Sequence, residues 1–323
     1  MATLPHILNS LTPKTKEESK LSQDQETYKT YQNIITTLPR ERGWDHGHLY
    51  CYKGFWYRDF HLKGVMAVRD HFVARPTDVL LATSPKSGTL WLKALVFAAL
   101  SSLNASNPHE CVPFLEIQLY TNDRIPDLDA LPPPRLFATH IPYSSLPESV
   151  KSSNCRIVYL SRDIRDVFVS LFHFGPVWEH VSEYWKVSLE RPDNVLFLKY
   201  EEMKRDPVLH LKRLAGFLGR QFSEEEEKEG VVEEILRICS FEHLKNLEVN
   251  KVGVLETAWG GIENRTFFRS GKVGDWAGCL TPENVRRLER VVEEKVSGSD
   301  GLSFFGGSGD QNGLSHSGVC SAS

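Results

Sequence analysis

The sequence has no excess of basic residues. Its 323 residues include 38 Lys and Arg against 42 Asp and Glu, which gives a formal net charge of −4 at pH 7. Proteins that bind nucleic acid usually show a strongly basic balance, so this weak acidity argues against that class of partner. A local cationic pocket for an anionic ligand is still compatible with such a balance.

Cysteines are few and lack the spacing of metal or redox sites. The chain has six, namely Cys51, Cys111, Cys155, Cys239, Cys279 and Cys320. No two are spaced as in a C-x-x-C motif, so the sequence indicates neither a zinc site nor a thioredoxin-like pair. We therefore expect no bound metal, and mostly reduced thiols in a reducing compartment.

Long apolar runs are absent as well. The N-terminus lacks the apolar core of a secretory signal peptide, and its acidic residues differ from the acid-poor pattern of an organelle transit peptide. These acidic residues are Glu17, Glu18, Asp24 and Glu26. The longest apolar stretches, such as 94–100, are far shorter than a membrane span. By elimination, the sequence predicts a cytoplasmic protein without a membrane segment.

The composition is that of a globular domain with polar ends. Hydrophobic residues make up 41% of the chain and charged residues 25%, which allows a sizeable core. Residues 1–25 are interpreted as a flexible N-terminal arm. Residues 298–323 are rich in Gly and Ser and are predicted to be a disordered tail. Residues 26–297 are left as a single domain.

Short apolar segments alternate with helical patterns through this domain. Buried strands are predicted at 78–84, 135–140, 156–162 and 194–200. Helices are predicted at 89–103, 164–174, 206–218, 223–238 and 282–296. Such alternation favours an α/β fold with a mainly parallel sheet flanked by helices on both faces.

Aromatic residues are dense between 44 and 60. They are Trp44, Tyr50, Tyr52, Phe55, Trp56, Tyr57 and Phe60. Core packing is the simpler explanation, and the wall of a pocket for a flat ligand is the alternative.

A phosphate-binding strand-loop-helix is predicted at residues 78–103. The loop contains Lys86, Ser87, Gly88 and Thr89, which provide a charge, two hydroxyls and a position for close backbone approach. Trp91 follows and could stack on a base. The pattern is not a Walker A motif, because the lysine precedes the glycine. A plain turn with a solvated lysine is the alternative.

Two further candidates stand at the predicted carboxyl ends of strands, where ligands bind in open α/β sheets. Arg162 could bind a phosphate with two hydrogen bonds, and Ser170 lies two turns into the next helix. The alternative is a surface ion pair of Arg162 with Asp163 or Asp166. His140 ends the strand at 135–140 and could take a proton from a hydroxyl at neutral pH, although a lone histidine is more often structural.

Several motifs, taken together and in this order, resemble the plant cytosolic sulfotransferases over about residues 25–296. The motifs lie at 85–91, 138–142, 162–170, 198–204, 239–241 and 268–276. The resemblance implies 3′-phosphoadenosine 5′-phosphosulfate as sulfuryl donor and no metal. It also implies a small hydroxylated acceptor, such as a flavonoid or a brassinosteroid, and indicates no obligate protein partner.

The resemblance also implies roles for individual residues. His140 would be the general base, and Lys86 would neutralise the leaving oxygen as the bond breaks. The 5′-phosphosulfate would be held by Lys86, Ser87, Gly88, Thr89, Leu90 and Trp91, with Trp91 against the adenine. The 3′-phosphate would be held by Arg162, Ser170, Arg269, Ser270 and Gly271, and the adenosine by Tyr200 and Phe241.

Three features depart from the family pattern. Leu90 stands where the family usually has a second threonine, and Ser270 stands where it usually has lysine. The lysine charge beside a phosphate is worth about 1.5–3 kcal/mol. After Phe174 the family continues for a helix of several turns that helps to wall the acceptor pocket, whereas here Gly175 follows at once.

Three functional hypotheses follow. The first is an active sulfotransferase. The second is a catalytically impaired family member that binds only nucleotide. Ser270 and the segment missing after Phe174 favour it, and the intact Lys86, His140, Arg162 and Ser170 oppose it. The third is a nucleotide kinase or NTPase on a related fold, which the absent Walker A glycine opposes.

Overall fold

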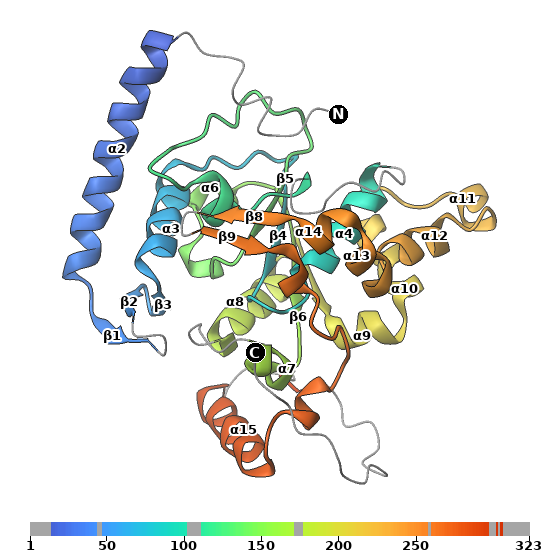
Figure 1. The fold of residues 1–323 in the computed structure, drawn as a ribbon. Helices are drawn as coiled ribbons and strands as arrows, with labels where there is room; N and C mark the ends of the chain where they lie inside the picture. The colour runs from blue at the N-terminus through green and yellow to red at the C-terminus, as the bar shows by residue number, and fades with distance from the viewer. Residues whose placement is uncertain are drawn as a thin grey trace.

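A four-stranded parallel sheet is the centre of the fold. The computed structural model describes residues 14–43, 47–101, 111–170, 177–257 and 260–296, together with 302, 304 and 305. The strand order is β5–β4–β6–β7, and every neighbouring pair is parallel (Figure 1). The strands are β4 (Val79–Thr83), β5 (Leu136–Thr139), β6 (Arg156–Ser161) and β7 (Val195–Lys199). The predicted α/β class and all four predicted strands are confirmed.

The sheet is buried on both faces because its strands are apolar at successive positions. All five residues of β4 are buried. Successive side chains of a strand point to opposite faces, so Val79 and Leu81 enter one hydrophobic core while Leu80 and Ala82 enter the other. A sheet with two cores of this kind must carry helices on both sides.

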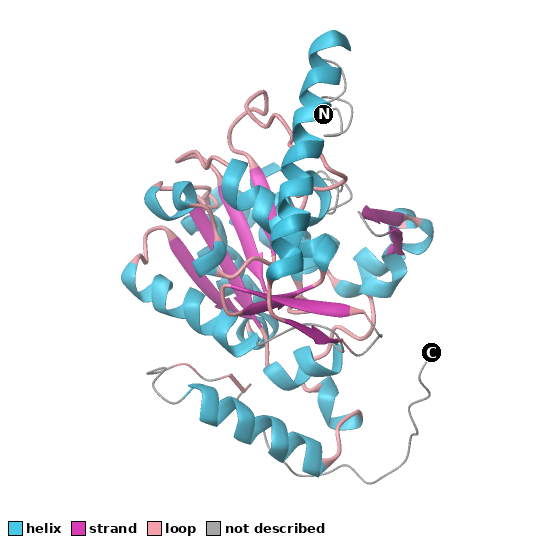
Figure 2. Ribbon diagram, turned by 90° about the vertical axis from the view of Figure 1, so that its left-hand side faces the viewer, coloured by secondary structure: helices cyan, strands magenta, loops and turns pink. Residues whose placement is uncertain are grey.

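Helices cover both faces, as the rotated view shows (Figure 2). The core with Leu81 includes side chains from α4 (Thr89–Ser101), α10 (Pro207–Phe217), α12 (Val231–Ile238) and α13 (Phe241–Asn246). The core with Leu80 includes side chains from α2 (Lys14–Thr37), α3 (Asp59–His71), α8 (Val177–Glu190) and α15 (Pro282–Val296).

Shorter elements connect these layers. Those between β4 and β7 are the π-helix η1 (Leu115–Leu119), η2 (Tyr143–Ser145), α6 (Glu148–Ser152) and α7 (Ile164–Ser170). Those after β7 are α9 (Tyr200–Arg205), α11 (Glu224–Lys228), α14 (Glu248–Val252), η3 (Asn264–Phe267) and η4 (Asp275–Gly278).

Two small antiparallel sheets were not predicted. One joins β1 (Arg40–Arg42), β2 (His48–Tyr52) and β3 (Phe55–Tyr57), and the other joins β8 (Val254–Thr257) and β9 (Gly260–Glu263). The first contains most of the aromatic segment predicted at 44–60, whereas Trp44 lies outside the described residues.

The structure differs from the predicted flexible arm at residues 14–25. These residues form the first half of α2 and continue into a packed helix. The carboxylate of Asp24, which is buried, accepts a hydrogen bond from the backbone N–H of Ile125 at 2.9 Å. Tyr28 adds a hydrogen bond to the carbonyl of Arg124 at 3.2 Å. These long-range contacts anchor the helix, and residues 1–13 lie outside the described part.

Two other predicted segments also differ. The helix expected at 223–238 is two helices, α11 and α12, because Gly230 between them takes a left-handed φ of 76°. Its predicted capping box at Ser223 is confirmed. Within the tail predicted to be disordered, Phe304 is buried, and its carbonyl accepts a hydrogen bond from the N–H of Ile164 at 3.1 Å. Leu302 and Phe305 are partly buried against the same core, and the other residues of the tail lie outside the described part.

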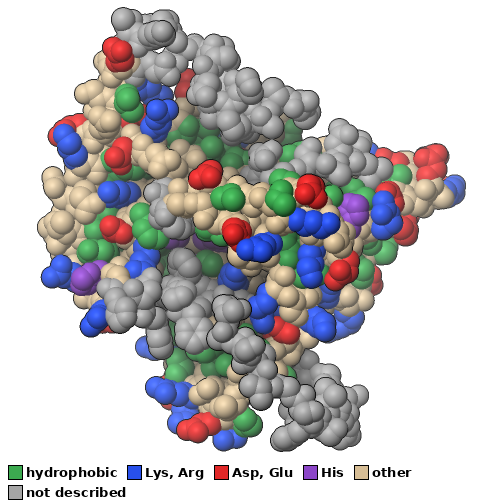
Figure 3. Space-filling model, in the orientation of Figure 1, with side chains coloured by type: hydrophobic (Ala, Val, Ile, Leu, Met, Phe, Trp, Pro, Cys, Tyr) green, Lys and Arg blue, Asp and Glu red, His purple; other side chains and the backbone are tan. Residues whose placement is uncertain are grey.

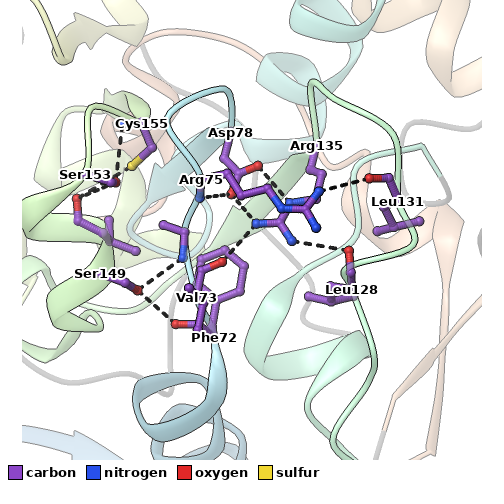
Figure 4. Close-up of polar contacts among 12 residues, drawn as sticks. Phe72, Val73, Arg75, Asp78, Leu128, Leu131, Arg135, Ser149, Ser153 and Cys155 are labelled. Atoms are coloured by element: carbon purple, nitrogen blue, oxygen red, sulfur yellow. Dashed lines mark hydrogen bonds and ion pairs between the residues drawn. The ribbon is translucent and has the colours of Figure 1, made fainter.

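A buried ion pair fixes the amino-terminal ends of β4 and β5 (Figure 4). Arg135 donates through Nε and Nη2 to both carboxylate oxygens of Asp78, at 2.8 and 2.5 Å. The two side chains are only 2% and 3% exposed. Arg135 also donates to the carbonyls of Leu128 and Val73, and Asp78 accepts the N–H of Arg75. One charge pair therefore ties the loops before both strands together.

Removal of this carboxylate should strongly destabilise the fold. We expect Asp78→Ala to lower the free energy of unfolding by about 3–5 kcal/mol, because it leaves the buried Arg135 guanidinium with only the exposed Asp129, 4.0 Å away, as a counter-charge. Urea unfolding at neutral pH measures the loss.

Asp129→Ala is the matched control. Asp129 pairs with Arg75 at 2.8 Å and lies 4.0 Å from Arg135, but its side chain is 87% exposed. An exposed pair of this kind contributes less than about 1 kcal/mol. Equal losses for the two variants would contradict the importance assigned to the buried pair.

Candidate active site

The candidate residues meet at one edge of the sheet. Because the four strands are parallel, their carboxyl ends lie along the same side. The residues that directly follow them are Ser84 after β4, His140 after β5, Arg162 after β6 and Tyr200 after β7. Ligands in open α/β folds bind at this edge. The fold therefore collects four separately predicted segments into one region.

The loop at residues 84–88 turns tightly between β4 and α4. Lys86 and Gly88 both have positive φ angles, 66° and 100°. The hydroxyls of Ser84 and Ser87 lie 2.6 Å apart, and both residues are buried. The turn delivers the chain to the start of α4, where the first N–H groups have no acceptor within the helix. This arrangement can bind an anion.

Gly88 is required by its position in the loop. A Cβ atom there would lie 3.0 Å from Cδ2 of Tyr200 and 3.4 Å from Cδ2 of Leu160. The residue therefore needs both the left-handed backbone and the missing side chain. Its contact joins the candidate phosphate loop to the residue that follows β7.

Lys86 projects from this loop. The residue is exposed, and its ammonium nitrogen lies 5.9 Å from the ring centroid of Phe267. The protein atoms around the amine and the positive charge of Arg269 lower the pKa of Lys86. The positive charges of Lys86 and Arg269 act on each other, so an anion bound near both side chains would be stabilised.

Tyr200 contacts three of the predicted segments. Its ring meets that of Trp91 edge to face, with centroids 5.3 Å apart, and the Arg162 guanidinium lies 4.6 Å from its centroid. Its hydroxyl donates to the carbonyl of Gly271 at 2.8 Å. Tyr200 therefore joins the segments containing Trp91, Arg162 and Gly271.

Arg162 is almost buried, with a side chain 8% exposed. It donates to the carboxylate of Asp166 at 3.2 Å and to the carbonyl of Lys272 at 2.7 Å. Asp166 also accepts the N–H groups of Gly274 and Trp276. The pairing with Asp166 considered from the sequence is present, but within a buried network. Nε of Arg162 is a buried donor that lacks an acceptor among the described residues.

Residues 269–271 lie beside the same network. Gly271 has a φ of 65°, and a Cβ atom there would be 2.4 Å from the ring of Phe241. Ser270 donates its hydroxyl hydrogen to Asp275 at 3.0 Å, and Arg269 pairs with the other oxygen of that carboxylate. Phe241 and Gly271 are thus in direct contact, as expected for two parts of one site.

The remaining predicted residues lie at the ends of helices: Thr89 and Leu90 begin α4, and Ser170 ends α7. Leu90 is half-buried in the first turn of α4. Thr89 shares a hydrogen bond of 2.7 Å with the hydroxyl of Thr83. Ser170 is the last residue of α7, and its side chain lies outside the described part.

His140 is held in a defined orientation at the end of β5. Its Nδ1 lies 2.8 Å from the carbonyl oxygen of Thr83. A carbonyl can only accept, so Nδ1 carries the hydrogen and Nε2 keeps the lone pair. Burial lowers the pKa of His140 from 6.5 to about 4, against the opposing charge of Glu116. Its imidazole is therefore neutral at pH 7, with Nε2 able to accept a proton.

A pocket lies in front of His140. Its lining residues are Phe55, Trp56, Tyr57, His61, Ser84, Pro85, His140, Pro142, Val177 and His180. Three aromatic residues of the 44–60 segment therefore face this pocket, although Phe55 and Tyr57 also belong to the core. Both explanations of the aromatic segment hold in part.

The space-filling view shows basic and acidic side chains interspersed on the visible face (Figure 3).

Two buried groups at the pocket are not among the residues predicted from the sequence: His180, which lines it, and Glu116, which lies behind His140. His180 contacts the carbonyl of His140 through Nε2 at 3.1 Å and the hydroxyl of Tyr159 through Nδ1 at 2.9 Å. Glu116 accepts the N–H of His140 at 2.7 Å. A signal existed for Glu116, because it is an acid between the apolar residues Leu115 and Ile117.

Among the described residues, Cys51, Cys155 and Cys239 are free thiols. In the same part of the chain, no group of three or more His, Cys, Asp and Glu is arranged to hold a metal ion. Every helix described is too short or too polar to cross a membrane.

The chain is similar to known sulfotransferases in sequence. A family model of the sulfotransferase domain matches residues 76–176 and 173–300. Cytosolic sulfotransferase 15 of Arabidopsis thaliana is 42% identical over 332 aligned positions, which cover 90% of this chain and 91% of the relative. That alignment is longer than the chain, so the relative contains positions without a counterpart here. The two matched segments meet at 173–176, next to the predicted missing segment.

Solved structures agree with this similarity. An Arabidopsis thaliana structure, provisionally named a steroid sulphotransferase, is 35% identical with a TM-score of 0.63, and the match covers 84% of this chain and 94% of that one. A mouse sulfotransferase complexed with PAP is 25% identical with a TM-score of 0.61, covering 78% of this chain and 95% of that one.

The buried histidines should make stability depend on pH. Burial lowers the pKa of His140 to about 4 and that of His180 to about 3, from the ordinary value of 6.5. At a pH between the lowered pKa and 6.5, each histidine binds a proton in the unfolded chain but not in the folded one. The free energy of unfolding should therefore fall as pH falls below about 6.5. Each histidine contributes up to about 1.4 kcal/mol per pH unit.

Urea unfolding at several pH values between about 5 and 7 measures this slope. In His180→Gln one titrating group is removed, so the slope should be smaller than in the unmodified chain. Identical slopes for the two proteins would show that His180 is not a buried neutral imidazole.

Proposed function

The chain belongs to the sulfotransferase family, and on that premise we propose that it transfers a sulfuryl group from 3′-phosphoadenosine 5′-phosphosulfate to a hydroxyl of a small organic acceptor. Family membership removes the nucleotide kinase hypothesis. The sequence relative named above is a cytosolic sulfotransferase, which supports the same location for this chain.

The observation that carries the proposal is the convergence of three anion-binding segments on Tyr200. The phosphate loop, Arg162 and residues 269–271 all contact this residue or its neighbours. Arg162 also presents a buried Nε donor without an acceptor among the described residues, which fits a phosphate. A mouse relative binds PAP, which is the donor without its sulfuryl group.

The family pattern suggests which residues hold each part of the nucleotide, and the geometry described above supports this proposal. Lys86, Ser87, Gly88, Thr89, Leu90 and Trp91 would hold the 5′-phosphosulfate, with Trp91 against the adenine. Arg162, Ser170, Arg269, Ser270 and Gly271 would hold the 3′-phosphate, and Tyr200 and Phe241 the adenosine. Since Ser270 replaces a lysine of the family pattern, Arg162 carries a larger share of the 3′-phosphate binding.

The proposed chemistry needs one proton acceptor and one cation. When bound, the donor supplies an activated sulfuryl group. His140 takes the proton of the acceptor hydroxyl on Nε2, which lets the oxygen attack sulfur as the bond to the leaving phosphate oxygen breaks. Lys86 offsets the negative charge that grows on the leaving oxygen.

The pocket indicates the shape of the acceptor. Phe55, Trp56 and Tyr57 offer aromatic surface next to His140, which suits a flat or polycyclic molecule such as a flavonoid or a brassinosteroid. One structural relative carries a steroid in its name, which supports the polycyclic class.

A nucleotide-binding protein without turnover is the second candidate. The matched family segments meet at 173–176, and the aligned relative has positions without a counterpart here. Those positions would wall the acceptor pocket in the family pattern. The contacts described for Lys86, Arg162 and Tyr200 on the donor side involve residues outside that segment, so this candidate binds nucleotide and transfers nothing.

Donor binding depends on Arg162 in both candidates. We expect calorimetric titration with 3′-phosphoadenosine 5′-phosphate to show micromolar or tighter binding, reduced at least about 10-fold by Arg162→Ala, because a charge-assisted contact is worth about 1.5–3 kcal/mol. Arg237→Ala, which changes an exposed arginine of α12, is the control and should bind normally. Absence of binding by the folded chain would exclude both candidates.

Turnover depends on His140. His140→Ala should lower kcat by about 100-fold or more while leaving nucleotide affinity unchanged, because the general base contributes about 10²–10⁴ in rate. His71→Ala, an exposed histidine at the end of α3, is the control. Loss of turnover and nucleotide binding together in His140→Ala would point to a structural role instead.

A further inference from the structure

A buried carboxylate lies directly behind the proposed base. Glu116 on η1 has a side chain that is 0% exposed. Its Oε1 accepts the backbone N–H of His140 at 2.7 Å, and its Oε2 accepts the hydroxyl of Thr139 at 3.0 Å. The same hydroxyl accepts the N–H of Ile141 at 3.0 Å. One side chain therefore fixes the backbone turn that carries His140.

The same carboxylate reaches a second histidine of the pocket. Nε2 of His61, on α3, lies 3.9 Å from Oε1 of Glu116. The pair forms because α3 packs closely on η1: a Cβ atom on Gly64 would lie 2.1 Å from the carbonyl oxygen of Glu116. Gly64 is one helical turn after His61, so this close approach brings the imidazole to the carboxylate.

Every element packed around His140 contributes a polar or charged group. The groups are His61 from α3, the Thr83 carbonyl from β4, Lys93 from α4, Glu116 from η1 and His180 from α8. The side-chain nitrogen of Lys93 is fully buried, which lowers the pKa of Lys93 well below its ordinary value. It lies 3.7 Å from the ring centroid of Phe114, which itself lies 4.6 Å from the His140 ring. Glu116 supplies the acidic charge of this set.

The charge on Glu116 is stable despite its burial. Burial alone raises the pKa of this carboxyl, but the nearby imidazole of His61 and the contacts with His140, including its backbone N–H, outweigh that effect and lower it. The group is therefore a fixed negative charge next to an imidazole that becomes positive when it accepts a proton. In the low-dielectric protein interior, this carboxylate charge would interact strongly with a positive imidazole close to it.

We propose that Glu116 is a positioning residue of the transfer reaction, which holds the turn after β5 so that Nε2 of His140 meets the acceptor hydroxyl and whose charge stabilises the imidazolium that forms. This role rests on the proposed function of His140 as base. It differs from the usual carboxylate–histidine pair, because the carboxylate contacts the backbone N–H of the base and a second histidine instead of its ring.

Glu116→Gln in the full chain is the test, since it keeps the shape and removes the charge. Three quantities are measured: affinity for 3′-phosphoadenosine 5′-phosphate, kcat with an acceptor turned over by the unmodified chain, and kcat/KM against pH. Glu183→Gln is the matched control, because Glu183 also accepts a backbone N–H, that of Ser144 at 2.9 Å, without contact to His140. Glu116→Asp retains the charge on a shorter side chain.

The role predicts a specific combination of results. In Glu116→Gln, kcat should fall about 10- to 100-fold, as for other residues that orient a reacting group, and nucleotide affinity should stay unchanged. The acid limb of kcat/KM should move to lower pH, because loss of the carboxylate charge lowers the pKa of His140 further. Glu116→Asp should keep the limb in place and recover part of kcat, and Glu183→Gln should resemble the unmodified chain.

Other outcomes overturn the role in distinguishable ways. Loss of nucleotide binding in Glu116→Gln, or a lower kcat with an unmoved acid limb, would make Glu116 a structural residue only. An unchanged kcat would remove any role in the reaction. If the unmodified chain binds the nucleotide but transfers nothing, the proposed function fails first, and the role of Glu116 fails with it.

Discussion

The parallel pairing of β5, β4, β6 and β7 is the constraint on which the site depends. Parallel strands bring their carboxyl ends to one edge, and in this chain each strand leads at once into a candidate segment: the loop from Ser84 after β4, and His140, Arg162 and Tyr200 after the other three strands. These residues are far apart in sequence and have no local reason to meet. Any change of strand order or direction would separate the donor-binding segments from the proposed base.

Buried polar contacts then set the geometry at both ends of the sheet. At the amino-terminal end, the Asp78–Arg135 pair ties the loops that precede β4 and β5. At the carboxyl end, Thr83 bonds to Thr89 through its hydroxyl and to His140 through its carbonyl, so one residue connects the phosphate loop with the base. Donor and acceptor sides of the site are thus fixed relative to each other through the backbone of β4.

Local patterns predicted the sheet and most of the site, whereas long-range contacts escaped prediction. The apolar run at 78–84 and its glycine-containing loop are local signals, and the structure agrees with them to within one residue at each end. The position of Glu116 behind His140 depends on how closely α3 approaches η1, which no periodicity reveals. Residues 14–25 were misjudged for the same reason, because a polar helix held by a buried Asp24 resembles a polar arm in sequence.

Transfer of sulfur itself tests the central claim most directly. The full chain would be incubated with donor labelled in its sulfuryl group and with flavonoid and steroid alcohols, and the label would be followed into the acceptor. The account predicts a labelled sulfate ester together with an equal amount of 3′-phosphoadenosine 5′-phosphate. Tight nucleotide binding without label in any of these acceptors would contradict an active sulfotransferase and leave the nucleotide-binding protein as the better description.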